Sequence, residues 1–254
     1  MKINRRKFLT LAGAAAAFGI AGKPTYDILA GEHGEPKPGV KRFAMIINLK
    51  KFMDNPQVMD KCINACHKAH NVPNINNQKN EVKWIWKEKF HHAFLEQDNY
   101  HLPAKVVNHP VLLLCNHCDN PPCVSVCPTK ATWKREEDGI VMMDWHRCIG
   151  CRYCMAACPY GSRSFNWKDP RQELKETTSE FPTRMKGVVE KCTFCDERIV
   201  KGKLPYCVEA CCDSEIMFGD LNNRKSEIRQ VLKNTYSIRR KPELGTQPEI
   251  YYII

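Results

Sequence analysis

The sequence predicts an α+β protein with two small, loop-rich halves, insertions and a C-terminal tail. Three observations support this fold class. The chain has 254 residues, which is enough for one large domain or two small ones. Its fifteen cysteines all lie between Cys62 and Cys212, and its sixteen prolines and thirteen glycines favour loops. We therefore expect something besides an apolar core to stabilise the fold: bound metal or disulfides.

Residues 1–22 predict an export signal. Arg5 and Arg6 precede a weakly apolar run rich in alanine and glycine, which is too short to span a hydrocarbon layer of ~30 Å. Paired arginines before a short apolar region are typical of a twin-arginine signal. Because this route carries folded proteins, metal centres can be inserted in the reducing cytoplasm. We expect the protein at the outer face of the cytoplasmic membrane, held there by a partner or by an uncleaved leader.

Few other regions carry clear signals of secondary structure. Residues 23–40 are rich in proline and glycine and predict a linker, whereas residues 74–105 show little beyond an aromatic patch. The remaining expectations are strands within 41–50 and 106–114, a polar loop over 168–186, a helix over about 224–234 and an extended end to the tail, which occupies 223–254.

Twelve of the fifteen cysteines form three quartets with repeated short spacings. The quartets are Cys115, Cys118, Cys123 and Cys127; Cys148, Cys151, Cys154 and Cys158; and Cys192, Cys195, Cys207 and Cys211. The first two quartets end directly before Pro128 and Pro159. Cys62, Cys66 and Cys212 lie outside the quartets.

The spacing of the second quartet is that of a cluster-binding run in two-cluster ferredoxins, where the fourth cysteine ligates the other cluster. The first quartet is the same pattern with a two-residue bulge. The two runs therefore predict a mutual pair of [4Fe–4S] clusters. The two predicted ligand sets are Cys115, Cys118, Cys123 and Cys158, and Cys148, Cys151, Cys154 and Cys127.

Zinc and disulfides are the alternatives. A structural zinc site prefers two C-x2-C pairs, and the intervening Cys151 fits this poorly. The third quartet is more ambiguous, because eleven residues separate Cys195 from Cys207. Repeated C-x2-C spacing in a chain of this length argues against a disulfide framework.

The chain resembles the iron–sulfur electron-transfer subunits that serve dimethyl-sulfoxide reductase, polysulfide reductase and related respiratory complexes. The resemblance rests on Cys115-Asn116-His117-Cys118, Arg147-Cys148-Ile149-Gly150-Cys151, Lys191-Cys192-Thr193-Phe194-Cys195 and Phe218-Gly219-Asp220, and runs from about residue 41 to 254. The stretch Ala65-Cys66-His67-Lys68-Ala69-His70 is most similar to the subunit of the heterodisulfide-reductase-like menaquinol-oxidising complex (DsrO). The family implies two ferredoxin-like halves, one from 41–73 with 186–222 and one from 106–165.

One family motif is incomplete in this chain. Phe52 stands where the first cysteine of the first motif is expected, and only Cys62 and Cys66 remain of that motif. The family's wiring then implies a third cluster on Cys192, Cys195, Cys207 and Cys66, with Cys211 as the alternative fourth ligand. The resemblance thus implies three [4Fe–4S] clusters, with Cys62 and Cys211 left without enough partners for a fourth.

The composition narrows the function. Contents of 43% hydrophobic and 26% charged residues exclude a wholly disordered, collagen-like or polytopic membrane chain. The net charge of +11 accompanies no nucleic-acid-binding motif, and three oxidised tetrathiolate clusters would offset it by roughly −6. We therefore expect no nucleic-acid partner. No catalytic constellation is evident, so we also expect a non-catalytic role.

We therefore expect a subunit that carries electrons through its clusters within a membrane-bound menaquinol-oxidising complex of respiratory sulfur metabolism. The resemblance implies hetero-oligomer partners: an integral-membrane, quinone-interacting subunit, a multihaem cytochrome c and other redox subunits. A freely diffusing exported polyferredoxin and a zinc-stabilised interaction module are the alternatives.

Overall fold

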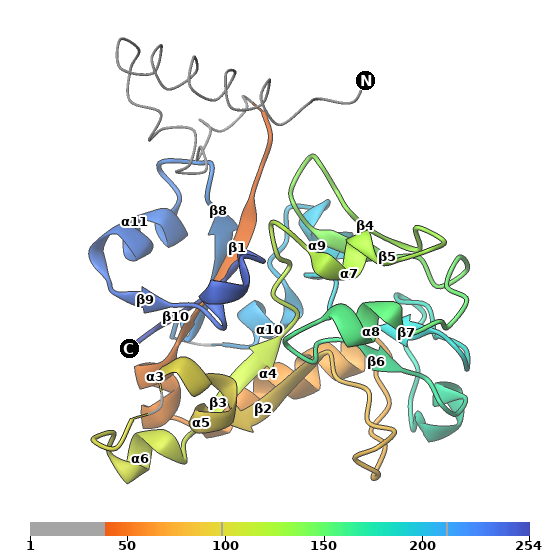
Figure 1. Ribbon diagram of the computed structural model, residues 1–254, viewed down its shortest axis with the longest axis horizontal. Coiled ribbons are helices and arrows are strands. Elements are labelled where there is room, and N and C mark those ends of the chain that lie inside the picture. Colours follow the sequence, from red (N-terminus) through yellow and green to blue (C-terminus); the bar gives the residue numbers. More distant parts are fainter. Residues whose placement is uncertain (1–38, 98, 212) are drawn as a thin grey trace, which may run out of the picture. The chain divides into compact units, whose positions relative to one another are not determined.

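The computed structural model describes residues 39–97, 99–211 and 213–254 (Figure 1). The predicted export signal, with Arg5 and Arg6, and most of the predicted linker lie outside these residues. The described part combines short helices with one four-stranded and three two-stranded sheets. The expected α+β class is confirmed at this level.

The largest sheet joins the start of the described chain to its end. Its strands, in spatial order, are β8 (Ile216–Asp220), β1 (Phe43–Asn48), β10 (Ile250–Ile253) and β9 (Ser237–Ile238). β1 runs antiparallel to β8 and parallel to β10, so Met45 is the partner of both Phe218 and Ile250. Two segments about 200 residues apart in the sequence therefore lie side by side in one sheet.

Both faces of β1 are covered, because its side chains alternate between two apolar clusters. Ala44 and Ile46 pack with Ile228 of α11 (Glu227–Asn234), while Met45 and Ile47 belong to the main core. Helix α11 approaches the sheet closely at Gly219, where an added Cβ would lie 2.8 Å from the Ile228 side chain.

Two helices follow β1. The side chain of Asn48 accepts a hydrogen bond from the Lys51 amide at 3.0 Å and caps α3 (Leu49–Asp54). The longer helix, α4 (Gln57–Ala69), packs against α10 (Tyr206–Glu209). Its buried residues, at the spacing of one helix face, are Val58, Met59, Cys62 and Cys66. The helix therefore presents two cysteines to the interior.

The aromatic patch of residues 74–105 marks a folded region. β2 (Ile85–Lys89) pairs antiparallel with β3 (Pro110–Leu114), and Trp84, Phe90 and Phe94 are buried beside them. The elements between these strands are α5 (Phe90–Ala93), η1 (Leu95–Gln97) and α6 (Ala104–Val107). These elements are short, which is why the sequence shows little periodicity here.

The cysteine quartets lie in loops between very short elements. These elements are α7 (Pro122–Ser125), β4 (Thr132–Lys134), β5 (Val141–Met143), α8 (Tyr153–Ala157), β6 (Ser164–Phe165), β7 (Val189–Glu190) and α9 (Asp196–Ile199). β4 pairs with β5, β6 pairs with β7, and α7 packs on α8.

The polar segment 168–186 is largely irregular, apart from η2 (Pro170–Glu173). Near its end the segment contacts the core through a buried ion pair, in which Nη2 of Arg184 lies 2.7 Å from Oε2 of Glu190. The indole of Trp84 donates a hydrogen bond to the same carboxylate at 3.0 Å. This network satisfies a buried charge pair that would be costly to leave unpartnered.

The C-terminal segment is part of the main sheet. The helix expected over about 224–234 begins at Glu227, and a second short helical turn, η3 (Pro242–Leu244), precedes β10. Ile250, Tyr252 and Ile253 are buried, which explains why this apolar end pairs with β1. Within residues 39–254, apart from 98 and 212, no helix is long and apolar enough to cross a membrane.

Candidate metal centres

Four of the cysteines expected to share a cluster line one cavity. Cys115 directly follows β3, Cys123 lies in α7, and Cys158 directly follows α8. Cys118 lies in the loop between the first two, and all four line the cavity together with Pro121, Pro122, Pro159 and Tyr160. The chain thus brings together thiols from both cysteine runs around one space.

Two of these thiols, those of Cys118 and Cys158, are poor acids when no metal is bound. Burial, reinforced by the neighbouring Cys115, raises the pKa of Cys118 to about 12, and burial also raises the pKa of Cys158. A thiolate is the form that ligates iron, so the site needs a strong positive charge to hold four of them. The donor set therefore fits a metal cluster much better than four free thiols.

Arg163 supplies one buried positive charge at this cavity. Its Nη2 donates hydrogen bonds to Cys123 Sγ at 3.0 Å and to Thr132 Oγ1 at 2.8 Å, and its side chain is buried. Burial disfavours its charge, but the nearby thiolates of Cys123 and Cys154 raise the pKa of Arg163 overall. The guanidinium therefore stays charged beside the ligands.

The second expected set lies closer to the surface. Cys127, Cys148 and Cys154 belong to one apolar cluster with Cys123, and Cys151 lies in the loop between Cys148 and Cys154. Cys127, Cys148 and Cys151 are half-buried, whereas Cys154 is buried in α8. This set is the one with the greatest access to solvent.

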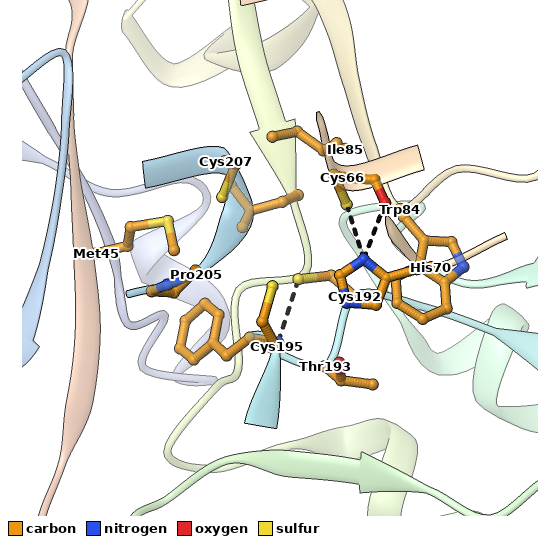
Figure 2. A pocket seen from close by; sticks show the side chains of 12 residues that line it. Met45, Cys66, His70, Trp84, Ile85, Cys192, Thr193, Cys195, Pro205 and Cys207 are labelled. Atoms are coloured by element: carbon orange, nitrogen blue, oxygen red, sulfur yellow. Dashed lines mark hydrogen bonds between the residues drawn. The ribbon is translucent and has the colours of Figure 1, made fainter. Parts of the chain in front are cut away.

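The third expected set surrounds a separate cavity, which we call the third cavity after this set. Figure 2 shows the sulfur atoms of Cys66, Cys192, Cys195 and Cys207 facing a common space, with Trp84 and Pro205 among the other lining residues. Cys66 comes from α4, Cys207 comes from α10, and Cys195 directly precedes α9. Helix α4 therefore contributes one thiol to a site whose other three come from more than 120 residues further along the chain.

The same electrostatic argument holds at this cavity. Burial and, to a lesser extent, the nearby Cys115 raise the pKa of Cys192 to about 12. Burial also raises the pKa of Cys66 and Cys195 well above the usual value for a thiol. Four thiols without a disulfide converge on a largely apolar space. This donor set also fits a metal cluster.

Lys191 is fully buried between the two cavities. Its Nζ donates hydrogen bonds to the carbonyl oxygens of Val141 and of Cys192, the latter at 2.7 Å. Burial lowers the pKa of Lys191, while the nearby Cys115 and Cys192 favour its charged form. A buried ammonium next to two sets of thiolates offsets part of their negative charge.

Cys211 does not line the third cavity. Its Sγ lies 2.7 Å from Sγ of Cys62, and it is absent from the lining of the cavity that holds Cys66 and Cys207. Phe52, which replaces the first cysteine of the incomplete motif, is fully buried in the same apolar cluster as Cys62. Cys212 lies outside the described residues.

Sequence reasoning missed Arg163, Lys191 and His70 as members of these sites. His70 lines the third cavity, and its Nε2 lies 3.1 Å from Glu197 Oε1. Lys191 directly precedes Cys192, so the only available signal was a basic residue next to a cysteine motif. Their burial depends on long-range packing, which local spacing does not report.

Comparison with known proteins agrees with the site. A family model for a 4Fe-4S dicluster domain matches residues 110–221. The "Hdr-like menaquinol oxidoreductase iron-sulfur subunit 1" of Archaeoglobus fulgidus is 40% identical and aligns with 98% of this chain and 97% of its own length. The chain belongs to this family of iron–sulfur subunits.

Two other relatives extend the family. The iron-sulfur cluster-binding subunit of a menaquinone reductase from Nitratidesulfovibrio vulgaris is 36% identical over 84% of this chain and 88% of its own length. The iron-sulfur subunit of an arsenate respiratory reductase from Shewanella sp. is 35% identical, covering 84% of this chain and 96% of its own length. As a member of this family, the protein is an iron–sulfur electron-transfer subunit, and the expected resemblance is confirmed.

Proposed function

We propose that this chain relays single electrons through three [4Fe–4S] clusters as the extracytoplasmic subunit of a membrane-bound, menaquinol-oxidising complex of respiratory sulfur metabolism. The relatives named above are subunits of menaquinol, menaquinone and arsenate oxidoreductases. The observation that carries the number three is the cavity formed by Cys66 with Cys192, Cys195 and Cys207. It gives a full set of four thiols to the motif that the sequence leaves ambiguous.

The ligand sets are those predicted from the cysteine pattern. The first cluster takes Cys115, Cys118, Cys123 and Cys158, and the second takes Cys148, Cys151, Cys154 and Cys127. The third takes Cys192, Cys195, Cys207 and Cys66. Zinc on the third quartet is disfavoured because Cys211, which would close that tetrahedron, pairs with Cys62 instead.

The first site adjoins each of the other two. Leu114 lines the third cavity and the next residue, Cys115, lines the first. His117 and Phe194, from the loops of these two sites, stack with ring centroids 3.7 Å apart. Cys123 of the first site shares an apolar cluster with Cys154 of the second. The first site therefore lies between the other two in the relay.

When bound, each cluster supplies one-electron chemistry at a potential set by its surroundings. The chain itself holds the thiolates, excludes water with apolar lining residues, places Arg163 against the sulfur of Cys123, and buries Lys191 beside the backbone of Cys192. Buried cations stabilise the more negative, reduced state, so these two residues raise the potentials of neighbouring sites. The half-buried second site is the end at which a partner approaches most directly.

The partners follow from the family. We infer an integral-membrane, quinone-interacting subunit and a multihaem cytochrome c, with the twin-arginine signal placing the complex at the outer face of the cytoplasmic membrane. A freely diffusing polyferredoxin would instead be recovered in the soluble fraction.

The test is anaerobic purification of the chain with its membrane partners, followed by metal analysis and electron paramagnetic resonance. Three clusters give about twelve irons and as many acid-labile sulfides per chain, and paramagnetic centres after reduction. Stoichiometric zinc without sulfide would overturn the proposal. If the protein is recovered only in soluble form without partners, the assignment of the clusters still holds but the assignment to a membrane complex is wrong.

A further inference from the structure

Cys62 and Cys211 form a close pair of thiols outside the three sites. Their Sγ atoms are 2.7 Å apart, compared with about 2.0 Å for a disulfide bond. Cys62 lies on α4, and Cys211 lies just after α10, the helix packed against α4. The two sulfurs come from segments that are 149 residues apart in the chain.

The pair lies one helical turn from the third site. On α4, Cys62 precedes Cys66 by four residues, and Cys211 follows Cys207 by the same number. On α4, Cys62 and Cys66 share one helix face, a turn apart. Cys66 and Cys207 line the cavity, whereas Cys62 and Cys211 contact each other. The Cys211 thiol also contacts the Cys207 carbonyl oxygen at 3.2 Å.

A fourth cluster does not fit between these two sulfurs. Each thiolate of a cubane binds a different iron, so the iron–sulfide core must lie between the ligand sulfurs. A separation of 2.7 Å leaves no space for that core. The buried Phe52 also stands where the family resemblance implies the first cysteine of the motif, so a further ligand is missing from the sequence.

From this geometry we propose that Cys62 and Cys211 form a disulfide bond, which replaces the lost cluster as the covalent link between α4 and the segment after α10. This feature is separate from the electron relay, although it assumes that Cys66, and not Cys211, completes the third ligand set.

The bond forms by thiol–disulfide exchange with an external disulfide, either a small-molecule disulfide or a disulfide-carrying oxidoreductase. Cys211 is half-buried and Cys62 is fully buried, so Cys211 meets the oxidant first. Its thiolate attacks one sulfur of the external disulfide and releases one thiol. Cys62 then displaces the second thiol, so two protein thiols and one external disulfide become one protein disulfide and two external thiols.

The bond would brace the third site. It closes a loop of about 150 residues, and a link across so long a loop restricts the unfolded chain strongly. It also fixes α4 against the segment that carries Cys207, and hence the relative position of two ligands of one cluster.

The direct test is disulfide mapping on the complex isolated from membranes without reductant. Free thiols and cluster thiols are alkylated in acidified denaturant, and the unreduced protein is digested with trypsin. The expected product joins the peptide of residues 62–68 to that of residues 204–224. Because the first also holds Cys66 and the second also holds Cys207 and Cys212, fragmentation must place the link at Cys62 and Cys211. Alkylation of both of these thiols in the unreduced protein would overturn the proposal.

Variants separate a disulfide from ligation. Cys62→Ser and Cys211→Ser should each abolish the linked peptide, leave the iron content unchanged and lower the melting temperature by on the order of 5–10 °C. The double variant should have the same melting temperature as the single variants, because all three lack the same disulfide bond. Cys66→Ser is the matched control: it keeps the linked peptide and loses iron.

Other results identify the alternatives. If only Cys211→Ser loses about four irons, Cys211 is the ligand of the third cluster and the disulfide is wrong. If wild type holds about sixteen irons and both variants lose four, a fourth cluster occupies the pair. Either result would leave the electron-relay function standing, because the remaining sites are independent of this bond.

Discussion

Nη2 of Arg163 donates a hydrogen bond to Sγ of Cys123 at a distance of 3.0 Å, inside the protein. A bound cluster gains one negative charge on reduction, and a cation held against a ligand sulfur stabilises that charge. The sequence contains many basic residues, but this one touches a predicted ligand. It is therefore the side chain expected to tune the first cluster most directly.

Replacing Arg163 by methionine should lower the reduction potential of the first cluster by on the order of tens of millivolts, because the reduced state loses its nearby cation. Redox titration followed by electron paramagnetic resonance measures the shift. Arg163→Lys should recover part of it, and Arg224→Met, at an exposed position, is the control for charge alone. An unchanged potential in Arg163→Met would contradict the role given to this contact.

Replacing Lys191 should change the potentials of two clusters, whereas replacing Arg163 should change one. Its ammonium lies between the first and third cavities, near Cys115 and Cys192, so Lys191→Met should lower the potentials of both clusters. The variant also leaves the carbonyl oxygens of Val141 and Cys192 without their donor, which should cost about 1–3 kcal/mol of stability. Titration of the separate signals, together with thermal unfolding, checks both effects. A shift confined to one cluster would show that the charge acts on that site alone.

Local spacing grouped three of the four cysteines that line each cavity. The fourth comes from elsewhere in each case: Cys158 from the second quartet at one cavity, and Cys66 from outside the quartets at the other. Cys66 is different: it lies far from its partners, and only the family's wiring suggested it. Its placement depends on the packing of α4 on α10, which no local pattern encodes.

Long-range pairing is the part of the fold that could not be predicted. The final apolar residues were expected to be extended, but nothing local indicates that β10 enters the main sheet parallel to β1. A short apolar run is compatible with several partners, and its partner is decided by the tertiary core. The same limit hid the burial of Arg163 and Lys191, whose charged side chains suggest surface positions.

Glu249, which directly precedes β10, makes the stability of the folded protein depend on pH. Glu249 is buried beside Arg42, whose Nε donates to Oε1 at 2.6 Å, yet burial raises the pKa of Glu249 to about 7. The folded protein therefore holds a proton that the unfolded chain, with a pKa near 4.5, releases. The stability from this proton is fully present below about pH 4.5 and is lost as the pH rises to about 7.

Thermal unfolding of the intact holoprotein between pH 5 and 8 measures this dependence. Glu249→Gln should flatten the decline across this window, because a glutamine carries no titrating proton. An identical slope in wild type and Glu249→Gln would assign the decline to other groups.

The loop of the second site depends on a single glycine. Gly150 has φ +70°, and a Cβ at this position would lie 2.4 Å from the backbone oxygen of Gly187. A side chain here requires the loop carrying Cys148 and Cys151 to move, so Gly150→Ala should lose about four irons per chain while the other clusters remain. Gly202→Ala is a matched control, since Gly202 has the same φ of +70° and open space around it. Backbone strain is common to the two variants, whereas the clash belongs to Gly150 alone. Equal iron contents in the two variants would therefore show that close packing against Gly187 does not hold this ligand loop in place.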